Sequence, residues 1–230
     1  MINLKKGGRF NVKKSAPAVA GGSDVATSGI ERFCVGCKWG KIKKKAILLF
    51  GREKEVNVDL DLSCVMFNDR HEMVDWIYSP NYRVEYLTSY GYSKGKLVSQ
   101  GGGLKHSGDD LEGGSDSSDD NEIIQVDMSK VSPDVSVIIF FLNYVDEDKN
   151  GDFSKIPYAS IRLFEGTPDK VETVHATYNV AADPAFKNTK SMIMGKLVKQ
   201  NGQWAFDAIG DALKEDGLCE TINKIKESYV

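Results

Sequence analysis

A pair of aspartates, Asp59 and Asp61, is the first feature of the sequence that could do chemistry. The pair lies in an alternating apolar and polar stretch, and neither Lys nor Arg occurs between positions 56 and 68. In a β-strand, residues i and i+2 point to the same face, about 6.6 Å apart along the chain. Two carboxylates on one face repel each other unless a cation lies between them. The spacing therefore indicates part of a cation site.

A Gly- and Asp-rich segment offers the remaining ligands of such a site. Residues 106–127 hold eight acidic residues and neither Lys nor Arg. Glycines in this segment allow backbone carbonyl oxygens to turn inward beside the carboxylates. Ca²⁺ takes about 6–8 oxygen ligands of these kinds, whereas Mg²⁺ needs a stricter octahedron and transition metals prefer His or Cys. The residues predict a Ca²⁺ site, and a solvated acidic loop is the alternative.

A third acidic run begins at Asp146 and continues through Asp148 to Asn150 and Gly151. It matches the start of an EF-hand loop, Asp-x-Asp-x-Asn-Gly. The twelfth position, where an EF-hand needs a bidentate Glu, is Pro157. A predicted strand, not a helix, precedes the run. We therefore interpret it as a turn from which Asp146 could reach a shared cation.

Short apolar runs separated by Gly, Asn, Asp and Pro indicate which elements must position these residues. The predicted strands are 32–39, 46–50, 56–67, 135–145, 158–164, 171–178, 191–199 and 204–208. Residues 135–145 are nearly all apolar, as in a strand buried on both faces. Asn201-Gly202 is typical of a hairpin turn. The clearest helical pattern is 212–229. The expected fold is all-β, a two-sheet antiparallel β-sandwich with a short C-terminal helix.

The sequence has at least eight strand patterns and one clear helix, so residues 1–230 are interpreted as one sandwich domain. Two stretches interrupt it. Residues 15–30 are mostly small, and residues 80–105 carry several tyrosines before three consecutive glycines. We expect loop or hairpin insertions at 15–30 and 80–105, and the Tyr-rich part could form a protruding hairpin.

Composition and charge narrow the classes of function. The chain has 230 residues, of which 41% are hydrophobic, and this excludes wholesale disorder. Residues 1–58 hold 13 basic against 4 acidic residues, and residues 106–152 hold 2 against 13. No apolar run in the sequence is long enough to span a membrane, and four cysteines do not make a disulfide scaffold. The first residues have no apolar stretch after their charges, so we expect no secretory signal. A cytoplasmic protein is expected, and no motif for binding nucleotides or nucleic acid is found.

Cys34 and Cys37 have the Cys-x-x-Cys spacing of redox and half-zinc motifs. No second pair completes a zinc site, and an odd separation in a strand places the two sulfur atoms on opposite faces. We expect structural cysteines. A thiol-based redox protein acting through Cys34 and Cys37 is one alternative function. A Ca²⁺-dependent membrane-surface module, using the basic run 41–45 or the tyrosines of 82–92, is another.

These motifs resemble those of the TerD family of tellurium-resistance and general stress proteins. The strand that carries Asp59 and Asp61 resembles the family's Asp-x-Asp-x-Ser strand. Residues 106–122 resemble its Gly-Asp-Asn-x-Thr-Gly loop and acidic tail. Weaker matches lie at residues 3–8, 36–39, 126–140, 159–163 and 195–210.

The resemblance implies a cytoplasmic β-sandwich that binds Ca²⁺, as one or two ions, at one end and has no established catalytic activity. The ligands that it implies are Asp59, Asp61, Asp109, Asp110, Asp119, Asp120 and Glu122, with Asp146 as a further candidate. The sequence departs from the family pattern at Gly40 and Ser79, where the family has Asp and Asn, and at Asp110, where it has Asn. These departures change the expected coordination.

The expected function is that of a calcium-binding stress-response and tellurium-resistance module without catalytic activity. Occupancy of the site by the cation is expected to order a surface for partner docking. The expected partners are other stress or tellurium-resistance proteins, some of them at the inner membrane surface, and no nucleic acid.

Overall fold

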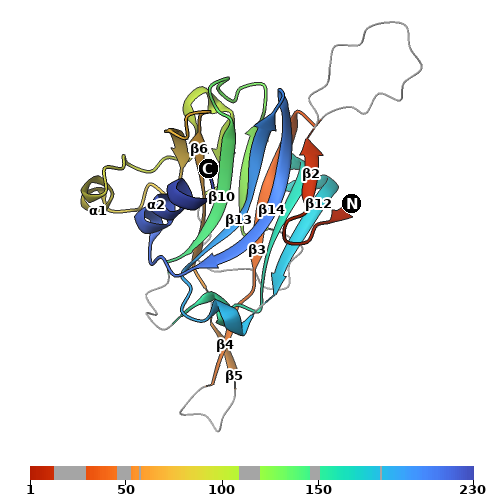
Figure 1. Cartoon of the computed structure of the whole chain (residues 1–230). Coiled ribbons are helices and arrows are strands. Elements are labelled where there is room, and N and C mark those ends of the chain that lie inside the picture. Colours follow the sequence, from red (N-terminus) through yellow and green to blue (C-terminus); the bar gives the residue numbers. More distant parts are fainter. Residues whose placement is uncertain (13–29, 46–52, 57, 109–119, 146–150, 182) are drawn as a thin grey trace, which may run out of the picture.

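Two β-sheets lie face to face and enclose an apolar core (Figure 1). The computed structural model describes residues 1–12, 30–45, 53–56, 58–108, 120–145, 151–181 and 183–230. Within these residues, the strand order is β1-β12-β11-β3-β9-β8 in the first sheet and β2-β14-β13-β10-β6-β7 in the second. Neighbouring strands are antiparallel, except that β1 runs parallel to β12. The predicted fold class is confirmed.

The strands of both sheets are mostly 4 to 12 residues long. The first sheet contains β1 (Ile2–Asn3), β3 (Arg32–Trp39), β8 (Leu104–His106), β9 (Glu122–Asp127), β11 (Tyr158–Thr167) and β12 (Lys170–Ala181). The second contains β2 (Arg9–Val12), β6 (Leu60–Phe67), β7 (Met73–Ile77), β10 (Val137–Tyr144), β13 (Ser191–Gln200) and β14 (Gln203–Leu213). A separate hairpin of β4 (Ile42–Lys45) and β5 (Glu53–Val56) projects from one end of the sandwich (Figure 1).

The helical elements are short. They are α1 (Val84–Ser89), α2 (Leu218–Ser228) and the 3-10 turns η1 (Gln100–Gly102), η2 (Phe153–Lys155) and η3 (Pro184–Phe186). In the described part of the chain, no helix has the length and apolar character needed to cross a membrane.

Strand β10 is buried on both faces, as its continuous apolar run predicts. Ile138, Phe140 and Leu142 pack in the core between the sheets. Ile139 and Phe141 point the other way and pack against the apolar side of α2. Helices α1 and α2 lie over the outer face of the second sheet and form an outer layer (Figure 1).

The predicted strand 56–67 is wrong as one continuous element. Strand β5 ends at Val56 in the separate hairpin, and β6 begins at Leu60. The carbonyl of Val58, between them, accepts a hydrogen bond from the Trp39 indole (3.0 Å), which fixes the backbone where the chain leaves β5. The predicted alternation holds in β6, where Leu60 and Leu62 enter the core between the sheets.

The predicted C-terminal helix is present but begins later than position 212. Residues up to Leu213 belong to β14, where Ala212 pairs with Met192. Gly217, whose φ of 130° is accessible to few other residues, precedes the first helical residue, Leu218. Sheet pairing therefore takes precedence over the helical spacing at 212–213.

The Tyr-rich segment is not the protruding hairpin that the sequence predicts. It contains α1, which is docked on α2 through tyrosine hydroxyl groups. Tyr86 donates to Oε2 of Glu220 (2.6 Å), Tyr90 donates to Oε1 of the same carboxylate, and Tyr92 donates to Asn223 (2.6 Å). Because Glu220 lies in the first turn of α2, its charge is also favourable to the helix dipole.

Other predictions have mixed outcomes. Asn201 and Gly202 have φ values of 52° and 77°, which confirms the hairpin turn between β13 and β14. The predicted strand 46–50 lies outside the described residues, and so does all of the predicted insertion 15–30 except its last residue.

We predict that Glu220→Gln lowers the stability of the protein at neutral pH by about 1 kcal/mol, or roughly 2–4 °C in melting temperature. Burial alone would raise the pKa of the Glu220 carboxyl, but the hydrogen bonds from Tyr86 and Tyr90 outweigh it and hold that pKa below its usual range. A depressed pKa stabilises the fold above the unfolded-state pKa, and this contribution disappears as the pH falls through the folded-state pKa.

The measurement is the difference in melting temperature between wild type and Glu220→Gln from pH 7 down to pH 3. We expect the difference to shrink toward zero at the acid end. Glu227→Gln, at an exposed position of the same helix, is the matched control and should show little difference at any pH. A pH-independent difference for Glu220→Gln would contradict the proposed role of its charge.

Candidate metal site

Asp61 is a carboxylate buried at one end of the sandwich. It is the second residue of β6, lies opposite Asn143 of β10, and is only 6% exposed. It lines a cavity of about 90 Å³ beneath the chain that leaves β7. The lining residues are Asp61, Leu62, Ser79, Pro80, Asn81, Leu97, His106 and Glu122, which we call the Asp61 pocket.

Asp59 lies near Asp61, as the sequence predicts, although it precedes the first residue of β6. Burial raises the pKa of Tyr82 well above its usual value, and the negative charges of Asp61 and Asp59 raise it further. Both carboxylates therefore act on the same phenol. The carbonyl of Asp59 accepts a hydrogen bond from the N–H of Val145 (3.1 Å), so the end of β10 also reaches this place.

Glu122 reaches the Asp61 pocket from the opposite sheet. It is the first residue of β9 and is 1% exposed. Its Oε2 accepts a hydrogen bond from the backbone N–H of Leu62 (2.6 Å). The structure thus brings together two of the predicted acidic residues, Asp61 and Glu122, although they are 61 positions apart in sequence.

Asp120 is placed elsewhere. Its carboxylate forms a salt bridge with Arg162 (2.7 Å) and lies over Gly36, where an added Cβ would collide with it. Asp120 is not among the residues that line the Asp61 pocket. The glycine at position 36 therefore makes room for an acidic side chain that already has a cationic partner.

The other predicted ligands, Asp109, Asp110, Asp119 and Asp146, lie outside the described residues. Their described neighbours are Gly108, Asp120 and Val145. Among described residues, no group of three or more His, Cys, Asp and Glu is arranged to hold a metal ion. Asp61 and Glu122 are therefore at most part of a coordination shell, and additional oxygen ligands would be needed.

Sequence analysis missed the polar residues that the turn after β7 brings to the same pocket. Ser79 stands where the resemblance leads us to expect an amide, but Asn81, two residues later, lines the pocket beside Asp61. An Asn side chain offers an amide oxygen, which is a Ca²⁺ ligand type. No local pattern marks Asn81, because its position depends on how the Tyr-rich segment folds over β6.

The run 146–152 is described only at its end. Asp152 caps η2, where it accepts hydrogen bonds from the backbone N–H groups of Ser154 (3.0 Å) and Asn188 (3.1 Å). This carboxylate is therefore used to close a turn. The rest of the run, residues 146–150, lies outside the described residues, so its interpretation as a turn stays a prediction.

The four cysteines are all unbridged and buried. Cys37 packs in the core between the sheets, whereas Cys34 packs on the outer face beside Phe164, so the predicted opposite orientation is confirmed. Burial, and secondarily the charge of Asp120, raises the pKa of Cys34 to about 11 and that of Cys37 well above its usual value. Both groups are thus protonated thiols at neutral pH, and the thiolate is the reactive form.

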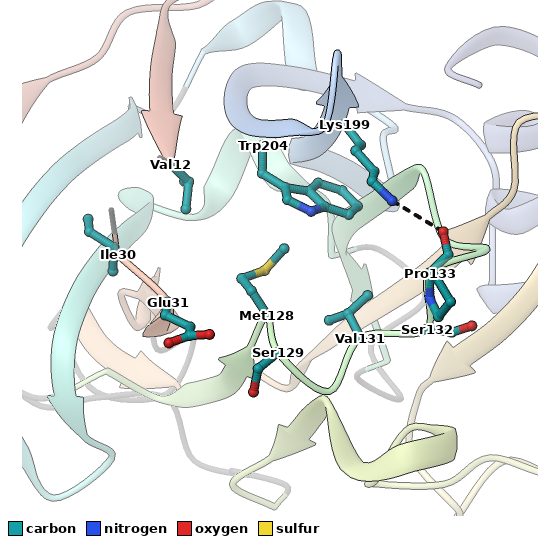
Figure 2. A pocket seen from close by; sticks show the side chains of 11 residues that line it. Val12, Ile30, Glu31, Met128, Ser129, Val131, Ser132, Pro133, Lys199 and Trp204 are labelled. Atoms are coloured by element: carbon teal, nitrogen blue, oxygen red, sulfur yellow. Dashed lines mark hydrogen bonds between the residues drawn. The ribbon is translucent and has the colours of Figure 1, made fainter. Parts of the chain in front are cut away.

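A larger cavity of about 250 Å³ lies at the opposite end of the sandwich (Figure 2). Trp204, Met128 and Val131 form an apolar wall, and Lys199 donates to the carbonyl of Pro133 (3.2 Å) at the rim. Glu31 is the only acidic residue among those that line it. This composition does not suit a hard cation.

Curated relatives of this chain are similar to it over most of their length and most of its own. The tellurium resistance protein TerZ of Serratia marcescens is 27% identical over 190 residues, which cover 82% of this chain and 83% of TerZ. The stress response protein SCP2 of Bacillus subtilis (strain 168) is 24% identical over 233 residues, which cover 97% and 98%.

A crystal structure of a homologue of telluride resistance protein (TerD) from Streptomyces coelicolor A3(2) has the same fold. Its TM-score is 0.52 at 12% identity, covering 82% of this chain and 93% of that one. A family model described as the TerD domain matches residues 1–224. Because this match spans nearly the whole chain, the protein belongs to the TerD family.

Proposed function

We propose that the protein is a non-catalytic, cytoplasmic stress-response and tellurium-resistance module that binds Ca²⁺ at the Asp61 pocket. The observation that carries the proposal is that Asp61, almost fully buried, shares a cavity with Glu122 and Asn81. The carboxylate and amide oxygens there are hard ligands of the kind that Ca²⁺ accepts. Sulfur and multiple imidazole ligands, which transition metals favour, are not among the residues that line the pocket.

Asp61, Asp59 and Asn81 are the proposed ligands among the described residues. Asp109, Asp110, Asp119 and Asp146 are proposed to complete the shell. Gly108, next to Asp109, bonds to His106 of the pocket, and Val145, next to Asp146, bonds to the carbonyl of Asp59. Asp120 is a weaker candidate ligand, because its salt bridge with Arg162 would have to break before it could bind the cation. Glu122 is left out of this ligand set because its carboxylate already accepts a backbone hydrogen bond.

The electrostatics of the pocket support a bound cation. Carboxylates in a poorly solvated place repel each other and favour protonation unless positive charge is near. Burial raises the pKa of Tyr82, and the negative charges of Asp61 and Asp59 raise it further, so both carboxylates bear on the same buried phenol. A divalent cation would relieve this repulsion without protonating either group.

The proposed output is a surface on the Tyr-rich segment. Asn81 lines the Asp61 pocket and also borders an open hollow formed with Tyr82, Arg83, Glu85 and Tyr86. Val84, in the same stretch, is 46% exposed. Cation binding would therefore order the chain that carries this surface, where we propose that another stress or tellurium-resistance protein docks.

Two alternatives fit the structure less well. A thiol-based redox role is disfavoured because Cys34 and Cys37 are buried and hold their protons. A membrane-surface role for the tyrosines is disfavoured because the hydroxyl groups of Tyr86, Tyr90 and Tyr92 are all bonded within the protein. Of these three rings, Tyr90, at 42%, is the exposed one.

We predict that Ca²⁺ raises the melting temperature of chelator-treated protein by about 5–10 °C at a hundredfold excess over Kd. A cation that binds only the folded state adds about 2.7 kcal/mol under these conditions. Mg²⁺ at the same concentration should have a much smaller effect, because an irregular set of ligands cannot easily impose a tight octahedron. Thermal melts in chelator, Ca²⁺ and Mg²⁺ provide the measurement.

Asp61→Asn should lose most of the Ca²⁺-dependent shift. Its melting temperature in chelator should stay unchanged or rise slightly, because one repelling charge is removed. Asp69→Asn makes the same charge change at an exposed position beyond the other end of β6 and should keep the shift. If Ca²⁺ stabilises wild type no more than Mg²⁺ does, the proposed function is wrong.

We also predict that Asn81→Ala weakens Ca²⁺ binding about tenfold, because it removes an oxygen ligand from the pocket. Asn81→Asp keeps an oxygen and adds a negative charge, so its affinity should equal or exceed that of wild type. Isothermal titration calorimetry of the two variants against wild type is the measurement. Unchanged affinity in Asn81→Ala would remove Asn81 from the proposed ligand set.

A further inference from the structure

The backbone of β6 is paired with β7 along only part of its length. Strand β7 pairs with β6 from Cys64 to Phe67, so it does not reach Leu62. Both backbone groups of Leu62 nevertheless have partners, and these are side chains of the opposite sheet. A buried backbone group without a partner would be costly, which makes these two contacts important for the end of the sandwich.

Glu122 provides the first contact. Its Oε2 lies 2.6 Å from the Leu62 nitrogen and accepts that hydrogen bond inside the protein. A hydrogen bond to an ionised carboxylate is stronger than one between neutral groups. The carboxylate at the start of β9 therefore ties the first sheet to the unpaired part of β6.

His106, in β8, provides the second contact. Its Nδ1 accepts a hydrogen bond from the N–H of Gly108 (3.0 Å), so the ring proton of the neutral imidazole is on Nε2. Nε2 lies 3.1 Å from the Leu62 carbonyl oxygen and 3.4 Å from Oε2 of Glu122. The imidazole thus donates a hydrogen bond to the Leu62 carbonyl, while Nδ1 accepts one from Gly108. Gly108 is the last described residue before position 109.

We propose that Glu122 and His106 are positioning residues that clamp the Leu62 peptide, and not Ca²⁺ ligands. The Leu62 N–H belongs to the peptide unit that joins Leu62 to Asp61. Fixing that unit fixes the backbone from which the Asp61 carboxylate enters its pocket. The same clamp, through Gly108, fixes one described end of the acidic segment. This inference rests on the proposed function, since it assigns roles around the cation site proposed above.

A conservative change at Glu122 distinguishes a positioning residue from a Ca²⁺ ligand. Glu122→Gln keeps an oxygen that can accept from Leu62 but removes the negative charge. A positioning residue should tolerate this change, and the Ca²⁺ affinity should stay within about threefold of wild type. Glu122→Ala removes the same charge and also the acceptor, and should weaken binding about tenfold or more, as losses of groups that orient metal ligands do.

The experiment is calorimetric titration of Ca²⁺ into chelator-treated wild type, Glu122→Gln, Glu122→Ala and Asp61→Asn, each well below its melting temperature. The inference holds if Glu122→Gln binds Ca²⁺ nearly as tightly as wild type does, while Glu122→Ala and Asp61→Asn both bind it weakly. It is overturned if Glu122→Gln binds Ca²⁺ as weakly as Asp61→Asn does, because Glu122 is then a ligand. It is also overturned if Glu122→Ala binds Ca²⁺ with wild-type affinity and only its melting temperature is lower. The two contacts to Leu62 then stabilise the fold without positioning the cation site.

His106→Leu provides an independent test if Glu122→Ala does not fold. This change keeps every acidic residue but removes the donor to the Leu62 carbonyl, and a neutral imidazole is a poor ligand for Ca²⁺. We expect affinity to fall about tenfold; unchanged affinity would overturn the inference. The titration of the wild-type protein tests the proposed function separately. If wild type does not bind Ca²⁺, that function is refuted whatever the variants do.

Discussion

Acidic side chains buried at one end of an apolar sandwich impose the constraint on which the rest of this structure depends. A carboxylate removed from water must meet hydrogen-bond donors or cations, because an uncompensated buried charge is costly. Three of the described acidic residues meet this requirement in different ways. Glu122 accepts the Leu62 N–H, Asp120 pairs with Arg162, and Asp61 lies in a pocket lined by polar groups that include Asn81. Asp61 and Glu122 line the same cavity, whereas Asp120 does not.

The fold explains how such a pocket can communicate with a surface. The chain that leaves β7 passes the pocket at Ser79 and Asn81 and then forms α1, which is attached to α2 through Tyr86 and Glu220. Helix α2 in turn packs on the outer face of β10. Under the proposed function, a change at the pocket would reach the outer layer through a few residues of continuous chain. Strand β10, buried on both faces, would provide a rigid base. The alternative, communication through the core between the sheets, would require rearranging close-packed side chains.

Local patterns in the sequence predicted the fold class, the two-faced burial of β10, the hairpin at Asn201-Gly202 and the opposite orientation of Cys34 and Cys37. These properties follow from periodicity and turn chemistry, which are written in neighbouring residues. The site was predicted less well, because its geometry depends on contacts between distant segments. The Asp-x-Asp spacing indicated Asp61. It could not indicate that Glu122 would accept a hydrogen bond from the Leu62 N–H, that Asp120 would pair with Arg162, or that Asn81 would line the pocket two residues after Ser79. The helix α1 was missed because six residues have too little periodicity to stand out among four tyrosines.

A crystal structure of the protein grown in Ca²⁺, with anomalous diffraction used to locate the ion, tests the central claim most directly. We expect an anomalous peak in the Asp61 pocket, with a carboxylate oxygen of Asp61 at about 2.3–2.6 Å from it. We also expect the Leu62 N–H still to be bonded to Glu122. An Asp61 pocket that contains only water or protein atoms at saturating Ca²⁺, or an ion bound solely at another place, would contradict a calcium site built on Asp61.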